Sequence, residues 1–177
     1  MNQWHACILA GLVFGGAACQ KTVPSQPPAP DKAVATQVLQ NFELNDVQKG
    51  VRTMMLQSTE ARIFEKEQVA DVDFPHVTFF KEAQISSQLW SQAGKIFLQT
   101  HEIEAWGSVR VVTADSATLT TERLRYDPQK QKIFSNEPVR LEKPDSVTEG
   151  QSFESDPSLK DIKISRQKVT MKKGVRQ

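Results

Sequence analysis

The sequence contains almost no cysteine that a folded domain could use. Of its 177 residues only two are cysteines, Cys7 and Cys19, and both precede residue 20. The chain beyond them has no thiol for a disulfide framework, a zinc cluster or a catalytic nucleophile. Thiol chemistry is therefore excluded for everything after the N-terminal segment.

The chain also lacks an excess of charge of either sign. It has 22 Lys and Arg residues against 21 Asp and Glu residues, so its formal net charge is +1. A protein that binds nucleic acid by neutralising many phosphates needs a clear basic excess. An acidic disordered tail would need the opposite excess. The composition therefore fits neither, and we expect no nucleic-acid partner.

Histidine is scarce as well, and the residues that could support catalysis stand apart. His76 and His101 are the only histidines after the N-terminal segment, and neither lies in a His-x-x-x-His or Glu-x-x-His arrangement. Asp71 and Asp73 share one face of an extended segment, but such a pair beside a proline is typical of a solvated loop edge. No glycine-rich phosphate loop occurs. We therefore expect no catalytic residue, no metal site and no cofactor, and a protein that is not an enzyme.

No apolar run is long enough to span a membrane. The longest, ACILAGLVFGGAA at residues 6–18, would extend about 20 Å as a helix, against about 30 Å of hydrocarbon. An apolar stretch that ends in small residues is typical of a secretory signal. Here the small residues 16–18 run directly into Cys19, which resembles a bacterial lipobox. The resemblance implies a signal peptide over residues 1–18 and a mature chain that begins at an acylated Cys19, held at a membrane by several acyl chains.

Other interpretations of this segment stay open. Residues 1–5 contain neither Lys nor Arg, although export signals usually begin with a basic stretch, and position 16 is Gly where lipoboxes more often have Leu. The segment could instead be a signal that is cleaved without acylation. It could also be a short anchor that is not cleaved.

Proline is concentrated directly after Cys19. Four prolines fall within thirteen residues that have almost nothing to bury, at positions 24, 27, 28 and 30. Proline favours the extended polyproline II conformation, which rises about 3.1 Å per residue. Residues 19–41 are therefore interpreted as a semi-rigid tether that lifts a domain off the membrane, with room for a helical turn or two at 33–39.

From about Gly50 onward, apolar residues recur at every second position. Such alternation is typical of strands that bury one face. No ten-residue window offers an apolar stripe at helical spacing. The sequence therefore predicts an all-β domain over residues 42–172, followed by a basic tail at 173–177. Turn-forming residues separate the alternating segments at 107–108, 127–128, 136–138, 143–145 and 156–157.

A repeat of about thirty residues runs through this domain. The segments that start at Leu56, Leu89 and Leu119 share a leading leucine, a small hydroxyl residue and an apolar pair, and their first residues are 33 and then 30 positions apart. A degenerate fourth copy starts at Thr148. A period of this length with two strands per repeat predicts stacked hairpins, none of which can bury its apolar face alone. We therefore expect an elongated domain built from stacked hairpins.

A set of motifs lies between about residues 119 and 164. It includes a hairpin that leads through Tyr126-Asp127 to Ile133, a Glu-Pro-Val segment at 137–139, and a Gly-x-x-Phe-x-x-Asp motif at Gly150, Phe153 and Asp156, followed by Leu159. Together these motifs resemble the LptC family, the periplasmic component of the lipopolysaccharide export bridge. The similarity extends back to about residue 50, so it covers some two-thirds of the chain. The same repeat occurs in the related bridge protein LptA.

This resemblance implies a twisted β-jellyroll of two antiparallel sheets that open into a V along one side. Lipid A acyl chains would lie between the sheets, while the sugars stay in water. Exposing an acyl chain of about a dozen carbons costs on the order of 10 kcal/mol, at about 0.8 kcal/mol per methylene, so a carrier needs a continuous apolar wall. The candidate wall positions, each of which could instead be ordinary core, are Leu56, Ile63, Val77, Phe79, Leu89, Ile96, Leu98, Val109, Val111, Leu119, Leu124, Tyr126, Val139, Leu141 and Phe153.

Stacked hairpins leave an exposed strand at each end, and such an edge can pair with a neighbour's strand. By the resemblance, the N-terminal edge at about 50–63 would meet the jellyroll of the inner-membrane ABC transporter, an LptBFG-type complex. The C-terminal edge at about 161–171 would meet an LptA-type protein. Basic residues crowd this last stretch and are typical of a solvated edge, although attraction to glycolipid phosphates or to an acidic partner is an alternative. They are Lys160, Lys163, Arg166, Lys168, Lys172, Lys173 and Arg176.

The resemblance therefore implies a periplasmic protein that accepts lipopolysaccharide from the transporter and passes it to LptA. It would be anchored at the inner membrane by Cys19 or by the short N-terminal segment, although Gln20 after the cysteine leaves the choice of membrane open. Two other functions stay open as well. One is a structural envelope lipoprotein whose closed β-domain binds another protein, and the other is an LptA-like link or outer-membrane component of the same route. An open apolar seam along the domain would favour transport over the closed domain.

Overall fold

The computed structural model describes residues 34–172, and within them the chain forms fourteen β-strands and no helix, which confirms the predicted all-β class. The signal segment, Cys19, most of the proline-rich tether and the basic tail at 173–177 lie outside the described residues. The strands are β1 (Gln37–Gln48), β2 (Val51–Phe64), β3 (Val69–Asp73), β4 (His76–Lys81), β5 (Gln84–Trp90), β6 (Ala93–Phe97), β7 (Ile103–Thr113), β8 (Thr118–Asp127), β9 (Lys132–Ser135), β10 (Val139–Glu142), β11 (Ser146–Gly150), β12 (Ser152–Ser155), β13 (Lys163–Ser165) and β14 (Lys168–Met171).

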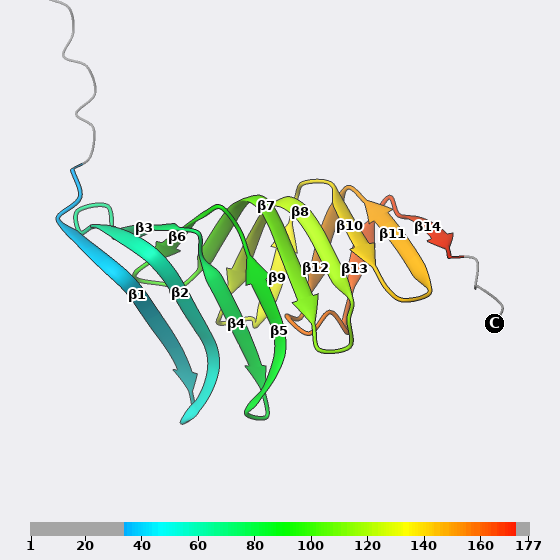
Figure 1. Cartoon of the computed structure of the whole chain (residues 1–177), viewed down its shortest axis with the longest axis horizontal. Helices are drawn as coiled ribbons and strands as arrows, with labels where there is room; N and C mark the ends of the chain where they lie inside the picture. The colour runs from blue at the N-terminus through cyan, green and yellow to red at the C-terminus, as the bar shows by residue number, and fades with distance from the viewer. Residues whose placement is uncertain (1–33, 173–177) are drawn as a thin grey trace, which may run out of the picture. The chain divides into compact units, whose positions relative to one another are not determined.

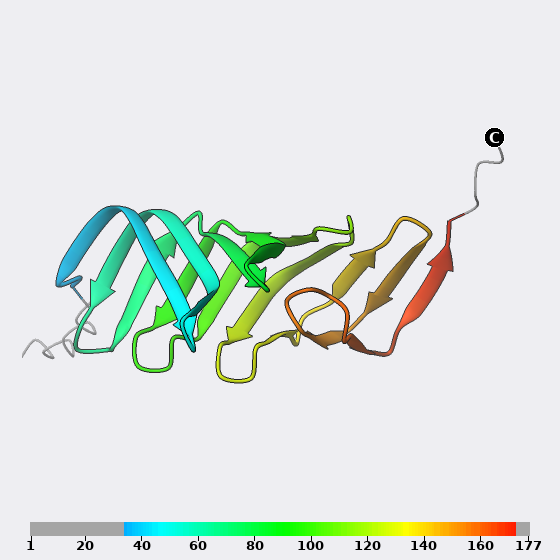
Figure 2. The same ribbon diagram turned by 90° about the horizontal axis from the view of Figure 1, so that it is seen from below.

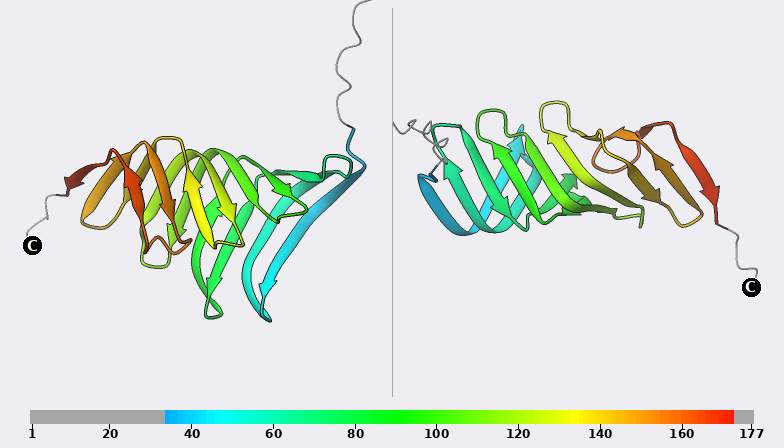
Figure 3. Two further views of the ribbon diagram at one scale, coloured as in Figure 1. Left: turned by 180° about the vertical axis from the view of Figure 1, so that it is seen from behind. Right: turned by 90° about the horizontal axis from the view of Figure 1, so that it is seen from above.

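The strands form one continuous antiparallel sheet that folds over a corner into two layers (Figure 1). We call the layer that contains β4, β5, β10, β11 and β14 layer A, and the layer that contains β3, β6, β9, β12 and β13 layer B. The strands β1, β2, β7 and β8 run through both layers. For example, β2 pairs with β4 through Met54–Gln57 and with β3 through Glu60–Phe64. Layer B lies behind layer A in Figure 1 and in front in the left view of Figure 3, and Figure 2 shows the strands crossing from one layer to the other.

Each pass of the chain over the corner needs a local break in the strand. Residues with positive φ supply several of these breaks, among them Asn41 (φ 52°), Phe74 (φ 49°) and Arg166 (φ 47°). Gly107 and Ser108 (φ 79° and 54°) do the same inside β7, where the register with β8 shifts. The expectation that residues 107–108 form a turn between strands was therefore wrong. Residues 136–138 do separate two strands as expected, and they join β9 to β10 across the corner. Turns and corners use the same left-handed backbone, so the sequence signal is the same for both.

The hydroxyl residue of the sequence repeat sits at this corner. Ser58 donates a hydrogen bond to the carbonyl of residue 60 at 2.6 Å, and Ser91 donates to the carbonyl of residue 93 at 3.0 Å. Thr121 makes a longer bond of 3.4 Å to the carbonyl of residue 123. Each hydroxyl thus satisfies a carbonyl two residues ahead where the strand bends, as a buried polar group requires. The repeat therefore encodes one corner per copy.

The leading leucines of the repeat meet in one row across layer A. Leu56 is opposite Val77, which is opposite Leu89, and the row continues through Val111 to Leu119. All five side chains point into the space between the layers and are buried, at 0–2% exposure. The stacked hairpins predicted from the repeat are confirmed, and successive hairpins extend both layers in the same direction.

The domain begins earlier than the sequence indicated. β1 starts at Gln37 and pairs along its whole length with β2, from Gln37 opposite Ile63 to Gln48 opposite Val51. Residues 37–41 were expected in the tether or in a helical turn, and they are strand instead. The alternation in β1 is weak because it is an edge strand, in which Phe42 and Leu44 are half-buried and every residue from 37 to 41 is exposed.

Opposite the corner, the hairpin turns of the two layers lie in two ranks, which together we call the rim. The layer A rank consists of residues 49–50, 82–83, 114–117 and 143–145, and the layer B rank consists of residues 65–68, 98–102, 128–131 and 156–162. Since the corner closes one side of the space between the layers, the rim is the side on which a ligand could enter.

Candidate functional site

The space between the layers is lined by apolar side chains in matching rows. Facing the leucine row of layer A, the row in layer B runs from Ile63 through Ala70, Ile96 and Ile103 to Tyr126. The two rows are seven residues apart within each copy of the repeat, because seven residues carry the chain from one layer to the other. Contact between layers is direct at Phe79 and Tyr126, whose rings meet edge to face with centroids 4.9 Å apart.

The fifteen residues proposed for the apolar wall lie in or against this interior. Ile63 and Leu98 are half-buried and pack against the core, and the other thirteen belong to the core, at 0–3% exposure. The periodicity missed further interior residues, chiefly Met54, Val72, Ile103 and Ile133, although alternation within their strands could have found them. Low exposure also means that the interior is filled by the protein's own side chains along most of its length.

Two amide hydrogen bonds hold the ranks of the rim together near β1. Gln48, at the end of β1, donates to the carbonyl of Pro128 at 3.0 Å and accepts from the side chain of Gln131 at 2.9 Å. These contacts join the layer A rank to the layer B rank. Beneath them, burial together with the carboxylates of Asp46 and Asp127 raises the pKa of Tyr126, so this phenol stays neutral at the mouth of the interior.

The Gly-x-x-Phe-x-x-Asp motif runs from the corner to the rim in the C-terminal part of the domain. Gly150 is needed because a Cβ there would overlap Ile164 and stand 2.8 Å from the carbonyl oxygen of Ser165. Phe153 is 3% exposed and fills the interior. Asp156 begins the loop 156–162 and accepts hydrogen bonds from the backbone amides of Lys160 and Asp161 at 2.8 and 2.9 Å. The three motif residues therefore have structural roles.

The loop 156–162 lies over the interior, buries Leu159 in it and packs Ile162 against it. Leu159 adopts a positive φ of 54° and is only 4% exposed, within the core cluster. Burial alone would raise the pKa of Asp156. The amides of Asp161 and Lys160 and the hydroxyls of Ser158 and Ser155 outweigh that effect and lower it to about 2. The carboxylate is therefore ionised at neutral pH and fixes the loop.

An aperture passes between the layers beside this loop. A cavity of about 180 Å³ is lined from layer A by Thr53, Phe79, Phe80, Lys81 and Ser86, and from layer B by Tyr126, Gln131 and Asp156–Ser158. It therefore connects the rim with Phe79 and Tyr126, two of the expected wall residues. A second hollow, of about 730 Å³, lies at the corner around Ser108, Thr121 and Pro138, on the opposite side of the layers from the rim.

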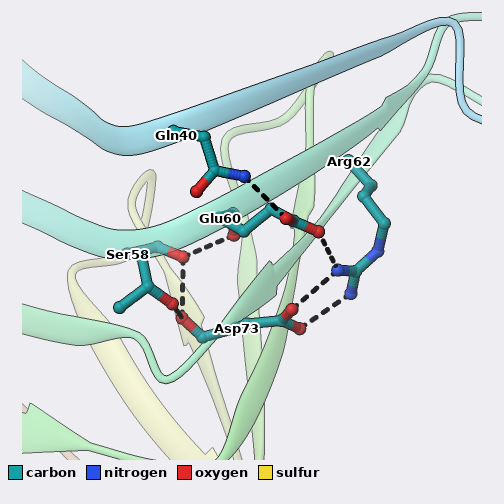
Figure 4. A network of polar contacts seen from close by, with 6 residues as sticks. Gln40, Ser58, Glu60, Arg62 and Asp73 are labelled. Atoms are coloured by element: carbon teal, nitrogen blue, oxygen red, sulfur yellow. Dashed lines mark hydrogen bonds and ion pairs between the residues drawn. The ribbon is translucent and has the colours of Figure 1, made fainter.

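The outer face of layer B carries ion pairs and no reactive cluster. Figure 4 shows the network at its N-terminal end, where Arg62 donates to Asp73 at 2.6 and 2.7 Å and to Glu60 at 2.6 Å, and Gln40 donates to Glu60 at 2.7 Å. The hydrogen bonds from Arg62 lower the pKa of Asp73. Asp71 pairs in turn with Lys95 at 3.6 Å. The two aspartates considered as a carboxylate pair thus serve as structural ion-pair partners.

The histidines also stand apart from each other in the structure. His76 stacks on Trp90 with ring centroids 5.0 Å apart, and burial lowers its pKa. His101 is exposed in the turn between β6 and β7. Residues 34–172 contain no group of three or more His, Cys, Asp or Glu side chains placed to hold a metal ion.

The two ends of the sheet differ from the expected edges in one respect. The segment 50–63, expected as the N-terminal edge, is β2, which is paired with β1 on one side and with β3 and β4 on the other. The edge is therefore β1. At the C-terminal end, β13 closes layer B and β14 closes layer A, so the expected segment 161–171 does contain the terminal strands.

The family model described as "Lipopolysaccharide-assembly, LptC-related" matches residues 6–171, nearly the whole chain. The chain belongs to this LptC-related family. Membership gives it a role in the lipopolysaccharide transport bridge and places it in the periplasm, as the sequence motifs implied. No match was found among curated proteins.

Among solved structures, the fold resembles the crystal structure of LptH from Pseudomonas aeruginosa, described as the LptA-homologous periplasmic component of the conserved lipopolysaccharide transport device. The two chains share 12% sequence identity and superimpose with a TM-score of 0.52, over 70% of this chain and 94% of that chain. At this identity the likeness concerns the fold alone. It agrees with the β-jellyroll expected for the LptC-related family. In residues 34–172 no helix is long and apolar enough to cross a membrane.

Proposed function

We propose that this LptC-related protein carries lipopolysaccharide by holding its acyl chains between layer A and layer B, while the sugars remain outside the rim. The observation that supports this most is the pair of matching apolar rows, which extend together with every added hairpin. The aperture beside the loop 156–162 reaches Phe79 and Tyr126 from solvent and supplies a starting point for opening. The protein acts as a carrier and not as an enzyme.

The energetics favour opening of the rim when a lipid is present. Acyl chains of about a dozen carbons gain on the order of 10 kcal/mol each by leaving water. The contacts that hold the rim near β1 are two amide hydrogen bonds, which contribute about 1 kcal/mol each. The apolar side chains of the interior would exchange contacts with each other for contacts with methylenes. The interior can therefore be closed when no lipid is bound and can open around a bound lipid.

The exposed edges supply the docking sites for the neighbouring bridge proteins. β14 is exposed along its whole length, with Val169 and Met171 at 54% and 67% exposure. β1 pairs on one side only and carries Val38 at 55% exposure. A partner strand added at either edge would continue both the sheet and its interior row. We assign the transporter's jellyroll to β1 and an LptA-type protein to β13 and β14.

Anchoring at the inner membrane is assigned to acylated Cys19, with residues 1–18 as the signal peptide and the proline-rich segment up to residue 36 as the tether. Replacement of Cys19 with alanine should release the protein from the membrane fraction. Continued retention in membranes would show that the uncleaved N-terminal segment is the anchor.

Site-specific photo-crosslinking in cells tests the lipid assignment. A benzophenone amino acid at Tyr126 or Leu98 should trap lipopolysaccharide, whereas one at Arg125, the outward-facing neighbour of Tyr126, should not. Depletion of the protein should also cause glycolipid to accumulate at the inner membrane. Protein adducts alone at Tyr126, with normal delivery of lipopolysaccharide to the surface, would refute the proposal.

A second candidate is supported by the low exposure of the interior. A protein-binding envelope lipoprotein with a permanently closed β-domain would bury its core to the same 0–3%. In that case the edges would bind protein and the interior would never meet lipid. Crosslinking at Tyr126 separates the two candidates. An LptA-like link in the same route would also trap lipid, and it would be distinguished by a partner other than the transporter at β1.

A further inference from the structure

Besides the aperture, the rim contains a second cavity that the proposed path for acyl chains does not explain. It has a volume of about 460 Å³ and lies between the β4–β5 turn, the β7–β8 turn and the loop 156–162. Its lining comprises Lys81, Glu82, Gln84, Ile85, Ser86, Ala114, Asp115, Ser158 and Lys160. Because Lys81, Ser86 and Ser158 also line the aperture, the two cavities adjoin.

The two lysines of this cavity come from opposite ranks of the rim. Lys81 ends β4 in layer A, and Lys160 lies in the loop 156–162 of layer B. Among the described residues neither forms an ion pair, and the same holds for Lys49, Lys66, Lys143 and Lys168, whereas the other described lysines are paired. Asp115 in the same cavity already accepts a hydrogen bond from the Thr113 hydroxyl, which lowers its pKa. Glu82 also lines the cavity, and the charge of Lys160 contributes to the lowered pKa of Asp115, so a bound anion would compete with these two carboxylates for the two ammonium groups.

The hydroxyl groups and the leucine below them complete the arrangement. Ser86 and Ser158 line the same cavity, where their hydroxyls already donate to the carbonyl of Phe79 and to Asp156, so their oxygens are held beside the two ammonium groups. Directly after Ser158, the side chain of Leu159 is buried in the interior. Cationic and hydroxyl groups therefore lie at the surface of the cavity, and the apolar side chain of the next residue, Leu159, lies in the interior. That order matches a molecule with an anionic head and hydrocarbon tails.

We propose that this rim cavity binds the phosphate of the acylated sugar headgroup, while the adjoining aperture admits the acyl chains past Leu159. The proposal rests on the proposed function and adds the position and orientation of the headgroup. Lysine is a compact cation that suits a phosphate oxygen, and the hydrogen bonds are charge-assisted. A phosphate held between Lys81 and Lys160 would also bridge the two ranks of the rim after the amide contacts at Gln48 have opened.

The test compares the affinity of lipid A with and without its phosphates for the full chain in lipid nanodiscs. In the double variant Lys81→Gln/Lys160→Gln, affinity for phosphorylated lipid A should fall about tenfold, which corresponds to about 1.4 kcal/mol. Affinity for dephosphorylated lipid A with the same acyl chains should not change. The matched control is Lys49→Gln/Lys66→Gln, which removes two lysines from the same two ranks but outside the cavity, and it should bind like the wild type.

The proposal is overturned if the wild type and Lys81→Gln/Lys160→Gln bind phosphorylated lipid A with equal affinity, or if the control variant loses as much affinity as the double variant. It is also overturned if inorganic phosphate binds as tightly as lipid A, because the cavity would then be a site for a free anion. A photo-crosslinker at Tyr126 in the wild type and in each lysine variant distinguishes failure of the headgroup site from failure of the proposed function. Lipid trapped at Tyr126 without any dependence on the lysines removes only the headgroup site. Absence of trapped lipid in the wild type removes both.

Discussion

Replacement of Gly150 with alanine should loosen the C-terminal end of both layers. Gly150 ends β11 at the corner, where β13 passes closely over it. A Cβ would overlap the Cγ2 methyl of Ile164 and stand 2.8 Å from the carbonyl oxygen of Ser165, a backbone atom that cannot move without β13. Inserting one methyl group into a packed site costs about 1–3 kcal/mol. We expect a loss of about 2 kcal/mol, or a fall in Tm of about 4–8 °C.

A double-mutant cycle shows whether this clash is the cause. Thermal unfolding gives the global loss, and hydrogen exchange should show reduced protection of the amides in residues 163–171. In an Ile164→Ala background the methyl overlap is absent and the carbonyl contact remains, so Gly150→Ala should cost about 1 kcal/mol less than in the wild type. An equal cost in both backgrounds, or a loss below about 0.5 kcal/mol, would refute the reasoning.

Two further predictions concern side chains that hold the rim and the N-terminal edge. The pKa of Asp156 is lowered from 3.8 to about 2, so its contribution is fully present above about pH 4 and is lost as the pH falls toward 2. With a discount for partial exposure, Asp156→Asn should cost about 1–2 kcal/mol at pH 7 in urea unfolding, and the difference from wild type should shrink on acidification. A difference that is independent of pH would contradict this assignment. Arg62→Ala leaves two carboxylates without their shared cation and should destabilise the domain by about 1 kcal/mol, less at high salt. Arg62→Lys should cause a smaller loss of stability than Arg62→Ala, because it keeps the charge but loses the bidentate contact. If Arg62→Lys is as stable as the wild type, the bidentate contact does not contribute to stability.

The sequence predicted the interior well because both its signals are local. Alternation at every second residue marks the side of a strand that is buried, and the thirty-residue repeat places Leu56, Leu89 and Leu119 in one row. Ile63, Ile96 and Tyr126 were expected as wall residues, but the structure alone shows that they lie in the facing row of layer B, seven residues after the leucines. What the repeat did not reveal was that each copy crosses a corner, since its hydroxyl residue could equally have belonged to a turn.

Features that depend on distant parts of the chain could not be predicted. β1 is strand because β2 pairs with it, whereas its own sequence, QVLQNFELNDVQ, does not alternate regularly between apolar and polar residues. The rim cavity unites Lys81 with Lys160, and nothing in either local sequence indicates the other. Whether an interior of this kind is filled by side chains or by lipid depends on how the layers pack, which a periodic pattern leaves open.

Partner strands at β1 and at β13 and β14 would extend both layers, so the interior would become continuous across proteins. The closed state protects the apolar rows from water when no lipid is present. Opening along the rim would then expose the interior only while a lipid passes.

The most direct test of the central claim is to lock the rim and measure lipid occupancy of the interior. Gln48→Cys and Gln131→Cys place two thiols on side chains that touch across the ranks. Cys19 is kept in both variants, because its proposed acylation anchors the protein and leaves no free thiol at that sulfur. Joining them with a cleavable thiol crosslinker should abolish trapping of lipopolysaccharide by a photo-crosslinker at Tyr126, and cleaving the linker should restore it. If the locked protein traps as much lipid at Tyr126 as the unlocked protein, acyl chains do not pass between the layers at this rim.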